Sequence, residues 1–321
     1  MRLCRFDDHG QPRAAFYNEE RLVPLAAAAR LYAEAVDRGF DLPDGDNLLE
    51  YLPLGNSAPQ AATLADWIEG AGSQLAKISI ATSGVKLLMP IPRPNKLLLL
   101  AGNYSEHIRE GGGVAAERSE TFPYVFMKPP STTLANPGDP IRIPTVSPGA
   151  IDWELELAVV IGRRIKGVRE AEALDAVAGY TVINDISDRK FRPNPGRTKR
   201  EKDTFFDWQH GKWHDGFCPC GPCVVSADRI TDPQQLEMQL RLNGEVRQHA
   251  STGQQIFPVA AVIEFISSFV TLEPGDIIST GTPSGVGSAS GTFLKPGDRL
   301  EASIVGIGTL VSPVEAQGDA A

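Results

Sequence analysis

Acidic and apolar residues alternate over residues 151–157, and the chain then continues as a run of β-forming residues. Successive side chains of a strand point to opposite faces, so Asp152, Glu154 and Glu156 are predicted to share one face, with the apolar residues between them on the other. A row of carboxylates that leads into a core strand raises the free energy of the folded state unless a cation compensates their charge. We therefore expect a bound metal ion at this point of the chain.

The balance of charge excludes one large class of partner. The chain has 321 residues, enough for a large core, and a net charge of −9 at pH 7. Nucleic-acid binding depends on a clustered excess of Lys and Arg, which this composition lacks. No apolar run approaches the roughly 20 residues of a membrane helix, and the first residues lack the apolar core of a signal peptide. We expect a cytoplasmic protein with a small-molecule partner and no contact with nucleic acid or membrane.

The four cysteines are too few for a disulfide scaffold. Three of them lie within residues 218–223, shortly after His210 and His214. This grouping leaves a zinc or redox site open, but two intervening prolines and the lack of a second cysteine pair fit the usual zinc patterns poorly. We favour small, buried loop residues.

Breaker residues divide the chain near residue 93. Residues 1–92 are predicted to form a small N-terminal α/β domain that ends in the proline-rich segment 90–94. Strand patterns dominate residues 93–315 and do not alternate with helices, so we expect an α+β, mostly β domain with a mixed sheet. Residues 316–321 are predicted to be a disordered tail. The predicted strands are 96–101, 124–127, 155–161, 180–183, 238–242 and 276–279, and the predicted helices are 23–39, 61–75, 170–178 and 258–269.

A further candidate ligand, Asp185, ends another apolar run. Two carboxylates from one strand and a third from a neighbouring strand end would form an all-oxygen ligand set, which suits Mg²⁺ or Mn²⁺ better than zinc. Three protein ligands would leave about three octahedral positions for water and substrate. Taken alone, Asp185 is equally well explained as the cap of a turn.

Several motifs occur in a fixed order between residues 96 and 312, and together they make the chain resemble the fumarylacetoacetate hydrolase family. The resemblance implies the mixed β-sandwich roll of that family, usually assembled as a homodimer. It also implies the metal ligands Glu154, Glu156 and Asp185, and a 2-oxo acid or β-diketo acid as substrate. The motifs lie at residues 102–110, 126–129, 152–162, 184–187, 242–245, 272–276 and 280–287.

His107 and Glu110 lie in a stretch that resembles the mobile lid of the family. A helical turn would place both side chains on one face. In members that hydrolyse C–C bonds such a pair activates water, so the resemblance assigns His107 as the base and Glu110 as the carboxylate that orients it. The glycines at 111–113 offer a hinge.

The resemblance also implies residues that hold the substrate. Lys128 lies in a Lys-Pro motif, and Lys212 matches a lysine that usually helps to hold the reacting oxygens. Gly281 and Thr282, in a Gly-Thr-Pro loop, are expected to contact the substrate carboxylate. Each of these residues could instead be an ordinary surface or turn residue, above all Lys212, whose surroundings depart from the family pattern.

The chain departs from the family after residue 187. Many members continue Ala-Arg-Asp-x-Gln, whereas residues 188–192 read Asp-Arg-Lys-Phe-Arg and are followed by a basic, insertion-like segment, residues 193–207. Arg192 takes the place of a glutamine at the substrate, and its planar guanidinium is suited to bind the distal carboxylate of a dicarboxylic substrate. A solvated loop that balances local acidity explains the segment equally well.

These expectations favour divalent-metal-dependent hydrolysis of a C–C bond in an acylpyruvate such as fumarylpyruvate or maleylpyruvate. The products would be pyruvate and a dicarboxylic acid, in aromatic catabolism. Decarboxylation of oxaloacetate, and isomerisation or decarboxylation of hydroxymuconate-type dienes, are alternatives on the same scaffold. A third alternative is a non-catalytic, metal-containing binding protein in which residues 218–223 serve as an interaction or redox element.

Overall fold

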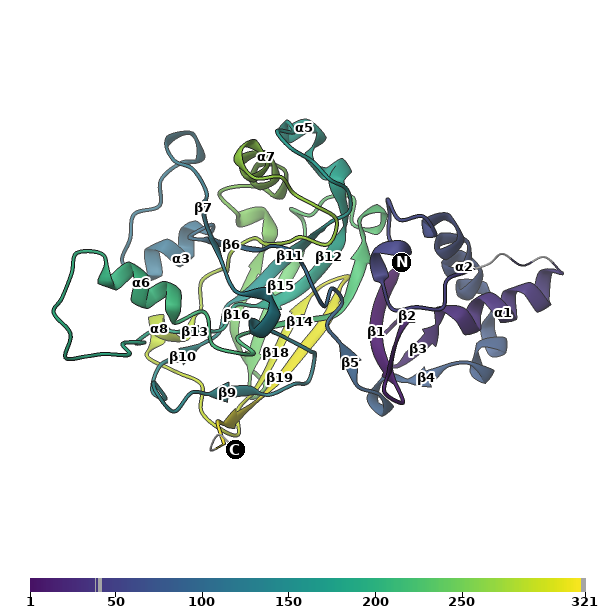
Figure 1. Ribbon diagram of the computed structural model, residues 1–321, viewed down its shortest axis with the longest axis horizontal. Helices are drawn as coiled ribbons and strands as arrows, with labels where there is room; N and C mark the ends of the chain where they lie inside the picture. The colour runs from purple at the N-terminus through teal and green to yellow at the C-terminus, as the bar shows by residue number, and fades with distance from the viewer. Residues whose placement is uncertain (38, 40–41, 319–321) are drawn as a thin grey trace.

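The computed structural model describes residues 1–37, 39 and 42–318, and Figure 1 shows its arrangement. The strands form a twelve-stranded sheet and a five-stranded sheet, and two further short strands pair separately. Eight α-helices lie around these sheets in the described residues. The α+β, mostly β fold with mixed sheets is therefore confirmed.

The twelve-stranded sheet has the order β4-β3-β2-β1-β14-β12-β11-β17-β6-β7, with β5 paired to β1 and β8 paired to β14. Its pairs are antiparallel except β6 with β17 and β8 with β14. The strands are β1 (Arg2–Asp8), β2 (Gln11–Tyr17), β3 (Arg21–Pro24), β4 (Ile80–Ala81), β5 (Leu87–Leu88), β6 (Leu97–Ala101), β7 (Tyr124–Met127), β8 (Leu134–Ala135), β11 (Leu155–Ile161), β12 (Val177–Asn184), β14 (Cys218–Ser226) and β17 (Ile277–Ser279).

The five-stranded sheet has the order β16-β15-β18-β19-β9 and is antiparallel except for β9 with β19. Its strands are β9 (Ile141–Ile143), β15 (Glu237–Leu242), β16 (Glu245–Ser251), β18 (Arg299–Ile304) and β19 (Gly308–Ala316), and the separate pair is β10 (Ile151–Asp152) with β13 (Ser187–Asp188). The helices are α1 (Leu25–Val36), α2 (Ala58–Gly70), α3 (Ser105–Glu110), α4 (Pro130–Thr133), α5 (Glu170–Ala173), α6 (Asp203–His210), α7 (Val259–Phe269) and α8 (Gly287–Ser290).

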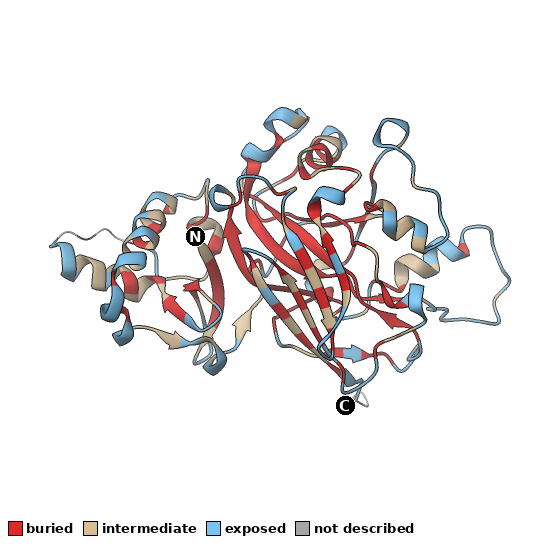
Figure 2. Cartoon of the chain, turned by 180° about the vertical axis from the view of Figure 1, so that it is seen from behind, coloured by how far each residue is buried: buried red, intermediate tan, exposed pale blue. Residues whose placement is uncertain are grey.

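Strand β11 lies in the middle of the structure and is buried on both faces, as the red central strands of Figure 2 show. Leu155 and Leu157 belong to the core cluster that contains side chains of the five-stranded sheet. Ala158 and Val160 belong to a second cluster that contains side chains of α1 and α2. Burial on both faces explains why the strand continues as an uninterrupted apolar run after Glu156.

The N-terminal strands extend the same large sheet, because β1 pairs with β14 (Figure 1). The expected boundary near residue 93 falls between β5 and β6. One sheet therefore runs through both expected domains, and the division into residues 1–92 and 93–315 stays a prediction. The expected tail begins on the last residue of β19, Ala316, and residues 319–321 lie outside the described residues.

Two local expectations were wrong. The helix expected over 170–178 ends early, because Val177 already begins β12, which is paired on both sides by β11 and β14. The cysteines of residues 218–223 lie on strand β14 and not in a loop. Pairing between distant strands prevails over local propensity in both cases.

The cysteines are buried and free of disulfides. Burial raises the pKa of Cys220 to about 12 and also raises the pKa of Cys218 and of Cys223. Thiols that are protonated at neutral pH are poor nucleophiles and poor metal ligands. These cysteines are part of the core.

Across the part of the chain that the structure describes, no helix has the length and apolar character needed to cross a bilayer.

Candidate metal centre and active site

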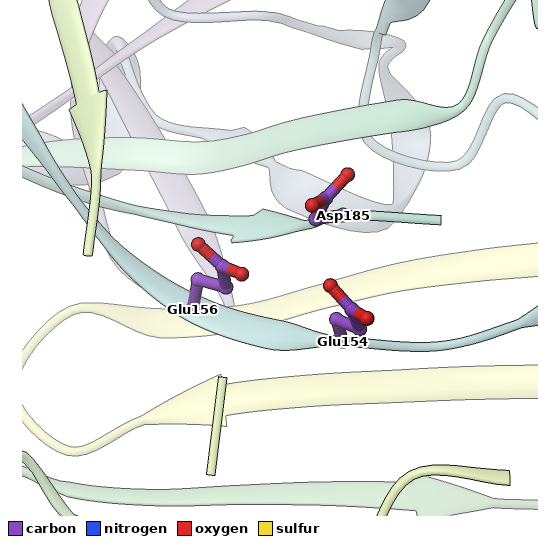
Figure 3. A group of neighbouring side chains, drawn as sticks. All are labelled: Glu154, Glu156 and Asp185. Carbon is purple, nitrogen blue, oxygen red and sulfur yellow. The ribbon is translucent and has the colours of Figure 1, made fainter. Parts of the chain in front are cut away.

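Three buried carboxylates, those of Glu154, Glu156 and Asp185, form the centre of the site (Figure 3). Each offers one ligand oxygen, and these oxygens all lie within 4.8 Å of one another. The pairing of β11 with β12 brings them together, because Leu155 lies opposite Asn184 and the backbone N–H of Asp185 donates to the carbonyl oxygen of Glu154 (2.8 Å). Asn184 Oδ1 also accepts from the backbone N–H of Glu154 (2.9 Å), which fixes the chain just before β11.

Lys212 lies between two of these carboxylates. Its Nζ donates to Glu154 Oε2 (2.9 Å), to Asp185 Oδ2 (2.6 Å) and to the hydroxyl of Ser187 (2.8 Å). Burial alone would lower the pKa of Lys212, but the charges of Asp185 and Glu154 raise it, so the ammonium stays protonated. The structure thus places Lys212 in the centre of the site.

Lys128 is fully buried and bonds to Asp185 and to two backbone carbonyl oxygens. Its Nζ donates to Asp185 Oδ1 (2.6 Å) and to the carbonyl oxygens of Ile186 (3.0 Å) and Phe217 (2.6 Å). An ammonium has three donors, so protein oxygens occupy all of them. Lys128 orients Asp185 in this arrangement, and its expected contact with substrate stays a prediction.

Arg189 is the main residue of the site that sequence reasoning missed. Its Nε donates to Asp152 Oδ2 (2.8 Å), and its Nη2 forms an ion pair with Glu154 Oε1. Asp152, which we expected on the same face as Glu154, also accepts from the backbone N–H groups of Gly287 (2.6 Å) and Ser288 (3.0 Å). Asp152 therefore holds Arg189 and the start of α8 in place and lies outside the carboxylate triad.

The electrostatics of the triad fit a divalent cation. Burial would raise the pKa of Glu154, but Lys212, Arg189 and His107 together lower it to about 2. Burial raises the pKa of Glu156 well above its usual value, and the negative charges of Asp185 and Glu154 raise it further. Glu156 Oε1 is buried and has no hydrogen-bond partner among the described residues. A buried oxygen that lacks a donor, beside two further carboxylates, is the ligand set that Mg²⁺ or Mn²⁺ prefers.

The other oxygen of Glu156 is held by the last residue of β17 and by the loop that follows it. Glu156 Oε2 accepts from the hydroxyl of Ser279 (2.6 Å) and from the backbone N–H of Gly281 (2.9 Å). Gly281 has a φ of +90°, and an added Cβ would lie 2.9 Å from the Cβ of Asn103, so this close approach requires glycine. Gly281 therefore supports a ligand residue, and its expected contact with substrate stays a prediction.

Gln248 of β16 fixes the loop that contains Thr282. Its Oε1 accepts from the backbone N–H of Leu155 (3.0 Å), and its Nε2 donates to Thr282 Oγ1 and to the carbonyl oxygen of Pro283 (both 2.8 Å). The backbone N–H of Thr282 has no acceptor among the residues that the structure describes. The expected contact of Thr282 with the substrate carboxylate stays a prediction.

The expected lid lies against this loop. Helix α3 carries His107 and Glu110, and His107 Nδ1 lies 2.7 Å from Glu110 Oε1. The second oxygen of Glu110 accepts from the backbone N–H of Gly285 (2.8 Å). His107 is also near enough to Glu154 for its charge to lower the pKa of that carboxyl group. The structure thus places the His-Glu pair against Gly285 and within electrostatic range of Glu154.

Arg192 lies apart from the triad. It is exposed and lines a cavity of about 540 Å³ together with Arg189 and residues of α6. The segment expected as an insertion, residues 193–207, includes the first half of α6, which was not predicted. The contact of Arg192 with a substrate carboxylate stays a prediction.

A sequence signal existed for one of the missed residues. Arg189 is the arginine of the Ala-Arg-Asp-x-Gln pattern, and it is retained where residues on both sides have changed. Gln248 gave no such signal, because it lies in β16, outside every motif, and reaches the site only through the packing of the two sheets.

Sequence comparison relates this chain to known proteins of one family. The sequence profile described as "Fumarylacetoacetate (FAA) hydrolase C-terminal" matches residues 96–315. The mitochondrial oxaloacetate tautomerase fahd2 of Xenopus laevis is 37% identical and is aligned over 86% of this chain and 85% of its own length. The oxaloacetate tautomerase YisK of Bacillus subtilis is 38% identical, over 84% of this chain and 86% of its own.

A solved structure shares the fold over nearly the whole length. It is that of maleylpyruvate hydrolase from Sphingobium sp. SYK-6 in complex with manganese(II) ion and pyruvate. The TM-score is 0.70 at 28% sequence identity, and the match covers 99% of this chain and 100% of that one. The extent of the profile match, the relatives and the shared fold show that this chain belongs to the fumarylacetoacetate hydrolase family.

Proposed function

We propose that this protein is a divalent-metal-dependent hydrolase that cleaves a C–C bond in an acylpyruvate of the fumarylpyruvate or maleylpyruvate type. The observation that carries the proposal is the His107–Glu110 pair, which Gly285 holds within electrostatic range of Glu154. Mn²⁺ or Mg²⁺, bound by Glu154, Glu156 and Asp185, would act as a Lewis acid on the oxygens of the 2-oxo acid and stabilise negative charge there. The named relative with manganese and pyruvate supports this choice of substrate class.

The residues of the chain account for the proton transfers. Glu110 accepts from Nδ1–H of His107, which leaves Nε2 free to take a proton from water. The hydroxyl group adds to the acyl carbon, the bond between that carbon and the pyruvyl methylene breaks, and the methylene takes up a proton. One water molecule is consumed, and pyruvate and a carboxylic acid leave. Glu110 stabilises the imidazolium that forms at His107.

The test is product analysis with the Mn²⁺-loaded protein on fumarylpyruvate, maleylpyruvate, acetylpyruvate and oxaloacetate. We expect pyruvate and the corresponding acid from the acylpyruvates, with kcat lowered about 10²–10⁴-fold in His107→Ala. Arg109→Ala is the matched control, because Arg109 lies on the same helix but pairs with Glu106 at the surface. Absence of acid product from every acylpyruvate would refute the hydrolase proposal.

Tautomerisation of oxaloacetate is the second candidate, and the names of the two relatives favour it. In this reaction His107 would move a proton between the enol and the methylene carbon, and no bond between carbons would break. Loss of the ultraviolet absorbance of enol-oxaloacetate, without formation of pyruvate or CO₂, measures this activity. A high rate with oxaloacetate and no cleavage of acylpyruvates would select the tautomerase.

We further propose a homodimer, as the family resemblance implies. Its support is an apolar surface at the edge strand β7, where Phe122, Tyr124 and Met127 are exposed together with Phe269 of α7. Edge strands and exposed aromatic side chains are typical of interfaces. Light scattering after gel filtration should show twice the chain mass, and Tyr124→Asp should reduce it to the monomer. Val246→Asp, an exposed position of β16, is the control.

A further inference from the structure

The cavity beside Arg192 is unusually basic for a chain with a net charge of −9. Its wall includes five basic side chains, Arg189, Lys190, Arg192, Arg197 and Lys199. It also includes two acidic side chains, which belong to α6. The distribution of charge on this wall therefore depends on which of the basic groups already have partners.

Two of the five are committed to acidic partners. Arg197 pairs with both acidic residues of the wall, Asp203 (3.1 Å) and Asp207. Arg189 pairs with Asp152 and Glu154 through Nε and Nη2, so only its Nη1 is without a partner among the described residues.

The remaining three have no acidic partner anywhere in residues 1–37, 39 and 42–318. Arg192 and Lys199 are exposed, and the ammonium of Lys190 lies 5.6 Å from the centre of the Phe293 ring. Three uncompensated cations around one cavity of about 540 Å³ make a site for an anion.

The cavity shares two side chains with the surroundings of the triad. Arg189 lines the cavity and forms the ion pair with Glu154. Trp208 lines the cavity, and its ring centre lies 5.6 Å from Nζ of Lys212, which bonds to Glu154 and Asp185. The cavity therefore adjoins the surroundings of the triad at these two side chains.

We propose that this cavity binds the carboxylate at the far end of the substrate, with Arg192 and Lys199 as its specificity-determining residues. The inference rests on the proposed function. It names the residues that would select a substrate with a second carboxylate. A guanidinium presents two parallel donors to a carboxylate, and an ammonium adds a mobile point charge. A 2-oxo acid with a neutral far end would leave these donors without a partner.

The kinetic test compares a dicarboxylic with a neutral-ended substrate in Arg192→Ala/Lys199→Ala. We expect KM for maleylpyruvate to rise at least about 10-fold, with KM for acetylpyruvate unchanged. Arg200→Ala is the matched control, since Arg200 belongs to the same segment and is exposed but does not line the cavity. Equal changes of KM for both substrates, or no change for either, would overturn the proposal.

A binding measurement separates failure of this proposal from failure of the proposed function. Fumarate and crotonate differ only in that a methyl group replaces one carboxylate. Calorimetry on the Mn²⁺-loaded protein should show tighter binding of fumarate, and the double variant should abolish the difference. That result supports the anion site even if no acylpyruvate is cleaved. Equal affinities in the unmodified protein would refute the site whatever the reaction is.

Discussion

At the scale of single residues, Arg189 fixes the orientation of the Glu154 carboxylate. Its guanidinium joins Glu154 to Asp152, and Asp152 is anchored by the backbone of α8. Arg189→Lys keeps a positive charge but cannot hold two carboxylates in one plane. We expect kcat to fall roughly 10–100-fold, as for other partners of metal ligands, with the fold intact by circular dichroism. Arg200→Lys, in an exposed ion pair nearby, should leave kcat unchanged.

Glu156 makes metal binding dependent on pH. Burial and the charges of Asp185 and Glu154 raise its pKa, so in the metal-free protein it holds a proton over a range of pH above 4.5. A metal ion must displace that proton, and its affinity should therefore fall as the pH decreases. The raised pKa also means that the metal-free fold loses stability as the pH rises through it. Calorimetry of Mn²⁺ binding in buffers of different ionisation enthalpy measures the released proton.

In Glu156→Gln there is no such proton to release. The affinity for Mn²⁺ should be at least about 100-fold lower, because one of the three anionic ligands is lost. Its remaining pH dependence should be flat over the same range. A variant that still releases a proton would show that another group titrates on binding.

At the scale of elements, one hydrogen bond joins α3, the expected lid, to the loop after β17. Gly285 donates to Glu110, has a φ of +99°, and an added Cβ would lie 2.0 Å from the carbonyl oxygen of Arg247. Gly285→Ala must therefore displace the loop and remove this hydrogen bond. We expect faster hydrogen exchange in residues 105–113 and a lower kcat.

Gly111→Ala is the control for this prediction. An added Cβ at Gly111 meets backbone atoms only at 3.5 Å, an ordinary contact distance. The exchange of residues 105–113 should then match that of the unmodified protein. Equal exchange in the Gly285 and Gly111 variants would show that the lid does not depend on Gly285.

At the scale of the whole molecule, the triad links metal binding to stability. Its three ligand residues lie on or directly beside the paired strands β11 and β12, so a cation that binds all three joins these strands only in the folded chain. Mn²⁺ at about 100 times its dissociation constant should add about 2.7 kcal/mol to the free energy of unfolding. For a chain of this size the unfolding temperature should rise by roughly 5 °C. Scanning fluorimetry with and without a chelator tests this, and Glu156→Gln should show almost no rise.

The triad and the lid pair were predictable because local patterns specify them. Glu154 directly precedes β11 and Glu156 lies on it, Asp185 directly follows β12, and His107 and Glu110 are one helical turn apart. The roles of these residues were inferred from motifs that occur in the same order as in the family. These relations survive in the sequence because they depend on short spacing.

Other features depend on contacts between distant segments and could not be predicted. Arg189 reaches Glu154 across 35 positions of the chain. Helix α6 has only eight residues, buries only Asp203 among them and exposes Phe205 and Phe206, so too short a stretch of the sequence indicates it. Strand β14 contains two prolines, which argue against a central strand, yet it pairs with β1, β8 and β12.

The buried cysteines give access to the opening kinetics of the molecule. Cys4 lies on β1 and the other three lie on β14, so all four thiols are on the two strands that join the N-terminal region to the rest of the large sheet. A thiol reagent can reach them only when these strands separate or the chain unfolds. The rate of labelling under native conditions therefore measures how often this junction opens, and it does so without any introduced probe.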